Sequence, residues 1–174
     1  MTAHEIIFVL NEVGELGDPR VDIVEADLDA VFERHGDLCL VTVSVEGASA
    51  FTAAVDGVRR LTEAGFTVLR SYPDFVTRAE IADRLDITRQ AVGNWVRGER
   101  LATVSFPALV HLAAGGLWLW GDVVDWQRAS GCGSVAAELH FPSIEDHGAI
   151  DGYIEMQRRS VWAQTTCTAA TSAS

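Results

Sequence analysis

The side chains best suited to specific recognition gather in one stretch, DRLDITRQAVGNWVRGERL, at residues 83–101. Arginine pairs with guanine and with phosphate, and glutamine or asparagine pairs with adenine, so side chains of these types contact double-stranded DNA. If residues 88–97 form a helix, its outer side presents Thr88, Arg89, Gln90, Asn94 and Arg97. The residue types and their spacing therefore predict a surface that contacts DNA.

A second set of residues in this region predicts how that helix is held. A helix-turn-helix needs a small residue where its two helices touch, and apolar residues that lock the pair from inside. Helices predicted over TRAEIADRLDI and TRQAVGNWVRG, joined by a tight turn, bring these residue types to the inner side. The predicted inner set is Ile81, Ala82, Leu85, Ile87, Val92 and Trp95. Asp86 occupies the turn position where glycine is usual, and Gly98 ends the second helix.

The sequence EIADRLDITRQAVGNWVRGER, followed by FP and by LWLWGDVVDWQ, resembles the winged helix-turn-helix domains of excisionase-like and MerR-type bacterial regulators. The resemblance covers about residues 76–130. It implies that the second helix enters the major groove and that a hairpin around Gly115 and Gly116 forms a wing. Leu119 stands where such wings often carry a basic residue between two aromatic residues. The predicted DNA-binding set is Thr88, Arg89, Gln90, Gly93, Asn94, Arg97, Arg100 and Arg78, in which Gly93 leaves room for close approach.

Charge is distributed unevenly along the chain, whose formal net charge is -12. Residues 1–76 hold 14 acidic residues and 5 arginines, whereas residues 77–130 hold 6 of each. The chain as a whole would repel a polyanion, but a local arginine cluster still engages one within a Debye length of about 8–10 Å. We therefore expect weak nonspecific DNA affinity and a strong dependence on base contacts. A solvated acidic surface that only keeps the protein soluble is the simpler explanation of the same charge.

Other catalytic or ligand-binding arrangements are not indicated. The five histidines, at positions 4, 35, 111, 140 and 147, are scattered and lack the spacing of a helical metal site. The three cysteines form no CxxC pair, which predicts free thiols. No glycine-rich phosphate loop and no arrangement of a nucleophile with a base appear, so we expect no enzyme activity, cofactor or metal. Tryptophans 95, 118, 120 and 126 are expected to fill a small core rather than to stack on bases.

Strand and helix signals alternate ahead of this region. The segments EIIFVLNE, LCLVTVSVE and FTVLRSY are predicted strands, the second with Cys39, Val41, Val43 and Val45 on one side. A first predicted helix carries Val24, Leu28, Val31 and Phe32 on one face and ends near Gly36. A second is capped by Ser49, carries Phe51, Ala54, Val55, Val58 and Leu61, and ends at Gly65. After residue 76 the pattern becomes helical, with an extended segment and hairpin in FPALVHLAAGGLWLW and a short helix in GDVVDWQRA.

These elements predict an α+β protein with four parts. A small N-terminal βαβαβ unit, ferredoxin-like or similar, covers residues 1–74 and has an implied role in dimerisation or sensing. A winged helix-turn-helix domain covers residues 75–130, a linker with a helix capped by Ser143 covers 131–163, and a disordered tail covers 164–174. No apolar run approaches the ~20 residues that span a bilayer. We expect a cytoplasmic protein without a secretion signal or membrane contact.

Three hypotheses for the function follow from the sequence. The first is a sequence-specific transcriptional regulator, acting as a homodimer on double-stranded DNA with half-sites one helical turn apart. The second is an excisionase-type architectural protein that bends DNA. The third is an interaction protein, an adaptor or inhibitor, whose acidic N-terminal surface binds a basic protein partner while the helix pair is only structural.

Overall fold

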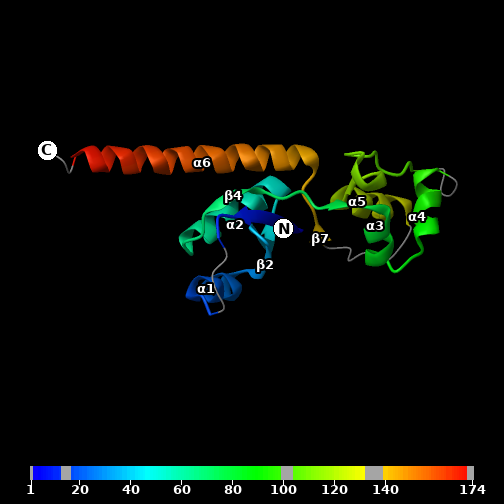
Figure 1. The fold of residues 1–174 in the computed structure, drawn as a ribbon, viewed down its shortest axis with the longest axis horizontal. Coiled ribbons are helices and arrows are strands. Elements are labelled where there is room, and N and C mark those ends of the chain that lie inside the picture. The colour runs from blue at the N-terminus through cyan, green and yellow to red at the C-terminus, as the bar shows by residue number, and fades with distance from the viewer. Residues whose placement is uncertain (1, 13–16, 99–103, 132–138, 172–174) are drawn as a thin grey trace.

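An antiparallel sheet forms the centre of the N-terminal unit. The computed structural model describes residues 2–12, 17–98, 104–131 and 139–171, with side chains described up to residue 160. Strands β1 (Thr2–Leu10), β2 (Asp29–His35), β3 (Leu38–Gly47) and β4 (Val68–Ser71) lie in the order β2-β3-β1-β4. Each of these neighbours pairs antiparallel, and β1 with its alternating buried residues is central. Figure 1 shows this sheet together with the helices of the chain. The protein is thus α+β, as the sequence predicts.

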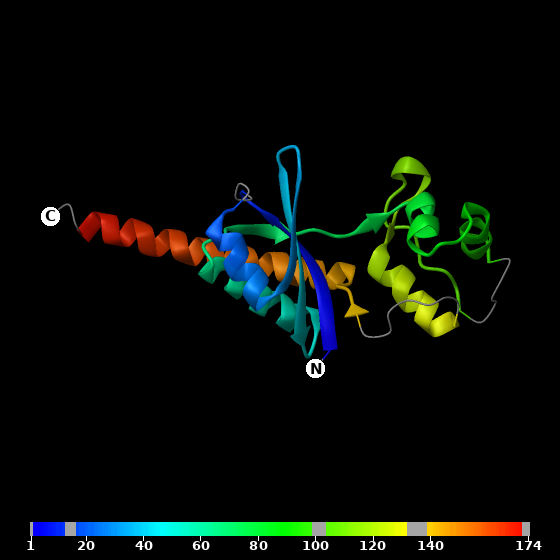
Figure 2. The ribbon, with the colours of Figure 1, turned by 90° about the horizontal axis from the view of Figure 1, so that it is seen from below.

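The prediction of one long helix carrying Val24, Leu28, Val31 and Phe32 is wrong. Helix α1 (Pro19–Asp27) ends at Leu28, and the following residues form strand β2. Gly36, with φ +63°, and Asp37 make the two-residue loop of a β2–β3 hairpin, in which His35 pairs with Leu38 (Figure 2). Successive side chains of a strand point to opposite faces of the sheet, which explains why Phe32 packs against the core whereas Val31 is 56% exposed.

The predicted βαβαβ order is corrected by this strand to β-α-β-β-α-β, the order of a split βαβ unit. The other predicted strands are present in β1, β3 and β4. Helix α2 (Ala50–Glu63) begins as predicted, because the Ser49 hydroxyl accepts from the Thr52 N–H and Thr52 reciprocates in a capping box. Gly65, with φ +96°, follows its end.

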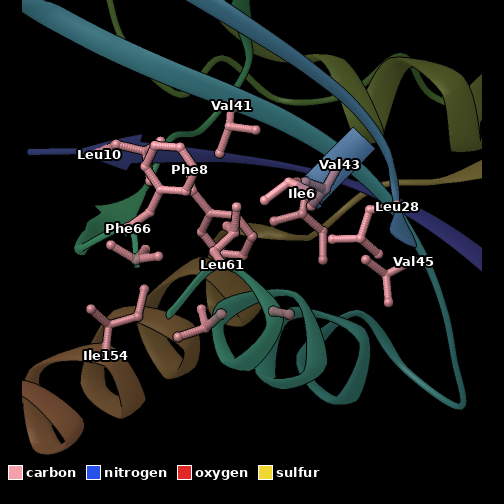
Figure 3. Packing of buried hydrophobic residues seen from close by; sticks show 14 of the residues in the cluster. Ile6, Phe8, Leu10, Leu28, Val41, Val43, Val45, Leu61, Phe66 and Ile154 are labelled. Carbon is pink, nitrogen blue, oxygen red and sulfur yellow. The ribbon is translucent and has the colours of Figure 1, made fainter. Parts of the chain in front are cut away.

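The core of this unit lies between the sheet and helices on one of its faces. Ile6, Phe8, Val41 and Val43 are completely buried against apolar residues of α2, including Leu61 (Figure 3). Each such side chain stabilises the fold by about 1.5–3 kcal/mol relative to an exposed one. The even-numbered positions of β1 therefore fix the sheet's orientation on its helices.

The C-terminal segment also belongs to this core. Strand β7 (Leu139–His140) pairs in parallel with Ala3 and His4 of β1. Helix α6 (Ile144–Thr171) then packs beside α2 on the same face of the sheet, and its Ile150 and Ile154 are 1% exposed (Figure 3). Residues 131–163 were expected to be a linker and an additional helix, but β7 and α6 complete the N-terminal unit.

The far part of α6 differs from the predicted tail. Its start is as predicted, since the Ser143 hydroxyl accepts from the Asp146 N–H. The helical backbone continues to Thr171, through residues 164–171 that were predicted to be disordered, while residues 172–174 lie outside the described range. After Gly152 no glycine or proline interrupts the segment, and alanine and glutamine favour helix. Among the described residues no helix is both long and apolar enough to cross a membrane.

A second unit stands apart from the sheet and has its own core. It comprises β5 (Phe75–Val76), α3 (Arg78–Arg84), α4 (Arg89–Val96), the short helix η1 (Ala113–Gly115), β6 (Trp118–Leu119) and α5 (Trp120–Ser130). Strand β5 pairs antiparallel with β6. Trp118 and Trp120 are buried, as expected, and lie with Val123 and Val124 in one apolar cluster. The chain enters this unit from β4 and returns from it to β7, so the second unit is inserted between parts of the first (Figure 2).

A buried polar cluster holds α6 to the sheet at the point where the chain leaves it. Asp151 Oδ1 accepts from the Ser71 backbone N–H at 2.6 Å and from the Ser71 hydroxyl at 2.8 Å. His147 Nδ1 lies 2.8 Å from the same hydroxyl oxygen, and Ser71 is 0% exposed. His147 and Asp151 are one helical turn apart, so α6 presents both to the end of β4. Burial lowers the pKa of His147, which favours the neutral imidazole.

This cluster predicts the effect of removing its carboxylate. In Asp151→Ala the buried N–H and hydroxyl of Ser71 lose their acceptor, so the free energy of unfolding should fall by about 2–3 kcal/mol. Asp151→Asn keeps an acceptor oxygen and should cost about 1 kcal/mol. Urea unfolding monitored by circular dichroism measures both, and equal losses in the two variants would contradict this role of the carboxylate.

Candidate nucleic-acid interface

Helices α3 and α4 are each started by a threonine that caps the exposed backbone N–H groups. Thr77 accepts from the Glu80 N–H, and the Glu80 carboxylate accepts from the Thr77 N–H at 2.7 Å. The latter bond is the main reason why the pKa of Glu80 is lowered. Thr88 accepts from the Ala91 N–H at 3.2 Å and so begins α4. Both helices are short, and their length is supported by these caps rather than by helix propensity alone.

The turn between the helices passes through a left-handed residue. Asp86 has φ +51°, one of two non-glycine residues with positive φ among those described. Its N–H donates to the Asp83 carbonyl, and the Ile87 N–H donates to the Ala82 carbonyl at 2.9 Å. The backbone therefore adopts the conformation that glycine usually supplies at this position. Aspartate tolerates it better than most side chains but at some cost in energy.

The predicted inner set is gathered in one apolar cluster. Ile81 and Val92 are 0% exposed and Ala82 is 1% exposed, so the two helices meet at a small residue. Leu85, Ile87 and Trp95 are partly buried and pack against the same cluster. Trp95 also stacks near Phe106 and lies 4.9 Å from Trp126, measured between ring centroids. The aromatic residues therefore fix the angle of α4 on the rest of the unit.

Most of the predicted outer set lies at the surface. Thr88, Arg89, Gln90 and Arg97 are exposed, and Asn94 is partly exposed. Arg89 forms no hydrogen bond or ion pair with the part of the chain that the structure describes, and Gln90 likewise donates to no described partner. These side chains stand on the first turn of α4, where the N-terminal end of the helix dipole favours negatively charged ligands.

Asn94 and Arg97 form a pair over Gly93. The Arg97 guanidinium donates to Asn94 Oδ1 at 2.6 Å. Gly93 is buried, and a Cβ atom at its position would lie 3.2 Å from Arg97 Nη1. The absence of a side chain at Gly93 thus lets the guanidinium lie against the helix. The space over Gly93, which was predicted to allow close approach of DNA, is taken by Arg97. Arg97 and Asn94 face the surface as one connected polar group.

The two remaining arginines of the predicted set are not on α4. Arg78 opens α3, is exposed, and its guanidinium lies 5.8 Å from the centroid of a Trp118 ring. This cation–π contact holds the charge beside the aromatic cluster. Arg100 lies outside the described residues.

The predicted hairpin around Gly115 and Gly116 is present as a tight loop, residues 110–117. The Val110 N–H donates to the Leu117 carbonyl, and the Leu117 N–H donates back to the His111 carbonyl. Ala114, Gly115 and Gly116 all have positive φ. The loop surface is apolar, because Leu112 is 81% exposed and Val110 is 39% exposed, and the preceding Leu109 is 44% exposed. Leu119 is 2% exposed and belongs to the core, so its position does not point toward a partner.

The sequence did not single out the group that joins this unit to the sheet. Asp74, just before β5, receives two hydrogen bonds from Arg84 of α3, at 2.5 and 3.0 Å. The Arg84 guanidinium also lies 4.8 Å from the centroid of a Trp120 ring. Glu5 of β1 lies near this pair, and its pKa is raised by burial first and by the Asp74 charge second. A capping motif, T-x-x-E at Thr77, was a detectable signal for α3, whereas nothing in sequence spacing linked Asp74 to Arg84.

A metal site is not indicated by the described side chains. No group of three histidine, cysteine, aspartate or glutamate residues within the described ranges could hold a metal ion. His4 is 7% exposed, and its ring centroid lies 5.8 Å from that of His140. Burial and the neighbouring His140 lower the pKa of His4, so the neutral ring is favoured there.

The left-handed turn predicts the response of stability to substitutions at Asp86. Asp86→Gly removes the steric cost and should raise the free energy of unfolding by up to about 1 kcal/mol. Asp86→Val introduces a β-branched residue at positive φ and should lower it by about 1–2 kcal/mol. Chemical unfolding of both variants checks the turn, and a valine variant as stable as the parent would mean that the turn differs.

Comparison with known proteins adds no relative. No family model, no curated protein and no solved structure matches the chain. The fold and the helix pair described above are therefore the grounds on which a function is assigned.

Proposed function

We propose that the chain is a sequence-specific DNA-binding transcriptional regulator, and that residues 75–130 act as a winged helix-turn-helix whose α4 enters the major groove. The observation that carries the proposal is the division of α4 into an anchored face and an exposed face. Val92 and Trp95 pack inward, while Arg89 and Gln90 stand at the surface without partners among the described residues. Such side chains discriminate base pairs by bidentate hydrogen bonds in the major groove.

The charge of the surroundings supports recognition of bases over general attraction to phosphate. Asp83 at the end of α3 and Asp86 in the turn before α4 are exposed acids, and the chain as a whole carries a formal charge of -12. Nonspecific affinity for DNA grows with the number of phosphates that a protein neutralises, so we expect the nonspecific affinity of this acidic protein to be low. Binding then depends on the few contacts that α4 makes to base edges.

A single helix-turn-helix makes few contacts to bases, which favours binding by two copies of the protein. A helix of this length, Arg89–Val96, reaches only a few base pairs. A homodimer that binds two half-sites about one helical turn apart converts the second binding step into an intramolecular one and raises the overall affinity. The N-terminal unit is the part proposed to join the protomers, or a protein partner, because it lies outside the reading helices.

Two substitutions on α4 test the proposal. Arg89→Ala and Asn94→Ala should each reduce discrimination between the preferred site and its single-base variants by about 1–3 kcal/mol, which is roughly 5- to 150-fold. Selection from a random pool of DNA duplexes identifies the site, and titration with labelled duplexes gives the ratio of affinities. Arg34→Ala, which removes the same charge from the exposed strand β2, is the matched control and should leave the ratio unchanged.

The outcomes separate the competing functions. If selection enriches no sequence, the regulator proposal fails. If the wild-type protein binds duplex DNA but Arg89→Ala and Arg34→Ala behave alike, α4 does not read bases. Absence of any DNA binding, with retention of a basic protein in pull-down experiments, would favour the adaptor hypothesis.

One observation favours an architectural role as a second candidate. The 110–117 loop and the preceding Leu109 present the exposed side chains of Leu109, Val110 and Leu112, and the loop carries no arginine or lysine. Proteins that bend DNA often insert apolar side chains between base steps in the minor groove. If the protein works in this way, Leu112→Ala should reduce the bend angle of circularly permuted DNA fragments while Arg89-dependent selectivity persists. An unchanged bend, or no bend in the wild-type complex, would exclude the architectural role.

A further inference from the structure

Strand β2 forms an edge of the N-terminal sheet, and its outer side pairs with no described strand. Its seven residues are matched one by one to residues of β3, without a bulge (Figure 2). The opposite edge is shorter and broken, because β4 has four residues and β7 has two, and the chain connects both to the second unit. Strand β2 is therefore the longer and the unbroken edge of the sheet.

The hairpin at the end of β2 determines which of its backbone groups face outward. His35 and Leu38 flank the two-residue loop and pair with each other, and hydrogen-bonded pairs alternate along an antiparallel ladder. Counted from the hairpin, Ala30, Phe32 and Arg34 turn their N–H and C=O groups away from β3. Because β2 contains neither a proline nor a bulge, all three residues are able to pair with a further strand.

The two faces of β2 differ in their side chains. Ala30 and Phe32 pack against the sheet core, and the Phe32 ring lies 5.3 Å from that of Phe66, measured between centroids. The other face carries four exposed side chains, namely Asp29, Val31, Glu33 and His35. The apolar core thus reaches the edge of the sheet on one face, while charged and polar groups occupy most of the other.

We propose that β2 pairs antiparallel with β2 of a second copy of this chain, with Phe32 at the twofold axis, so that the two sheets become one. In this register Ala30 of one copy lies opposite Arg34 of the other, and the residues with outward backbone groups all meet one another. The twofold axis keeps the cores of both copies on the same side of the joined sheet. The inference rests on the proposed function for the role of the dimer, whereas the pairing itself requires no DNA.

The charges on β2 favour this register over its neighbours. Registers that keep both cores on one side differ by a shift of two residues, because a shift of one residue turns a strand over. With Phe32 at the axis, Asp29 lies opposite His35 of the other copy, whose imidazole N–H is a donor for the carboxylate. A shift of two residues places Glu33 opposite Glu33 in one direction and Asp29 opposite Glu33 in the other. Like charges directly opposite each other destabilise a sheet.

Apolar contact at the axis adds to the backbone hydrogen bonds. The Cβ atoms of directly opposite residues lie about 4.5–5.5 Å apart, so the two Phe32 side chains contact each other on the core face. Each ring also packs against the core of its own unit, and the pair therefore joins the two cores across the edge. An unrelated strand would need an aromatic residue and matching charges at the same spacing, which a second copy supplies by symmetry.

Sedimentation equilibrium of the full-length protein without DNA tests the pairing. The wild type should form a dimer whose fraction rises with concentration. Arg34→Pro removes an N–H that faces away from β3, so it preserves the β2–β3 ladder and should weaken dimerisation about tenfold or more. Arg34→Ala loses the same side chain but keeps the N–H, and it should dimerise within about twofold of the wild type. Circular dichroism shows whether both variants keep the fold.

A cross-linking experiment tests the register separately. In the proposed pairing Val31 lies opposite Glu33 of the other copy, at a Cα separation that a disulfide spans, about 4.4–6.8 Å. Under oxidising conditions the double variant Val31→Cys/Glu33→Cys should form a covalent dimer. Neither single variant should do so, because its new thiol lies opposite a residue without one. The wild type, treated in the same way, reports any cross-link through the native cysteines.

The outcomes separate this inference from the proposed function. A monomeric wild type, an Arg34→Pro variant that dimerises as well as Arg34→Ala, or cross-linking by one of the single cysteine variants would each overturn the pairing. If Arg34→Pro does not fold, the cross-linking pattern decides. A β2-paired dimer that selects no DNA sequence would overturn the regulator and support the pairing, whereas a monomer that selects a DNA site would do the reverse. Arg89→Ala, which changes only α4, should dimerise like the wild type.

Discussion

The hydrogen bonds of Asp151 to Ser71 are the constraint on which the arrangement of the whole chain depends. Ser71 is the last residue of β4, and only Tyr72, Pro73 and Asp74 separate it from the second unit. The partner residues, His147 and Asp151, lie on α6 shortly after the chain has returned from that unit. The chain therefore leaves the sheet for the second unit directly after Ser71, and the helix that follows its return holds the partners of that residue. An unpaired buried N–H group destabilises the folded state. A shift of α6 along the sheet that broke these hydrogen bonds would therefore cost more free energy than the loss of a single apolar contact.

The junction around this cluster is nearly filled. Leu119, Gly121 and Phe141 meet Glu5 and Asp74 around a cavity of about 20 Å³, which is room for one water molecule. A Cβ atom on Gly121 would lie 2.9 Å from Cβ of Phe141, so α5 approaches the returning chain as closely as a glycine permits. Arg128 of α5 also donates to the Leu139 carbonyl of β7. The second unit is thus attached through packing and hydrogen bonds as well as through the chain.

Local signals in the sequence predicted the parts of the fold that depend on neighbouring residues. The capping serines, the alternation in β3 and the inner set of the helix pair all follow from spacing within a few residues. The missed strand β2 had such a signal too, because a Gly-Asp pair between two apolar runs is typical of a hairpin, but the helical spacing of Val24 to Phe32 suggested otherwise. The pairing of β7 with β1 and the bonds of Ser71 to α6 join residues far apart in the chain. No local pattern could predict them, since they depend on how complete elements dock.

Predictions for individual side chains on α4 were limited in the same way. The outward positions of Arg89 and Gln90 follow from helical periodicity, but the contact of Arg97 with Asn94 over Gly93 depends on the rotamers of long side chains. Asp86 was recognisable as unusual from its residue type alone. Its positive φ could be assigned only once the angle between the helices was known.

The insertion of the second unit also has a consequence for synthesis of the protein. Residues 2–71 are synthesised before the second unit, yet the sheet that they form lacks β7 and the helical layer lacks Ile150 and Ile154 until residues 139–154 have been synthesised too. Part of the β1 edge and an apolar strip of α2 stay uncovered throughout that interval, and such surfaces are prone to aggregation. The apolar cluster of the inserted unit lies within residues 76–126 except for Phe141, so most of its contacts are available earlier and the unit is free to fold early. Of the two units, translation therefore completes the inserted unit before the N-terminal unit.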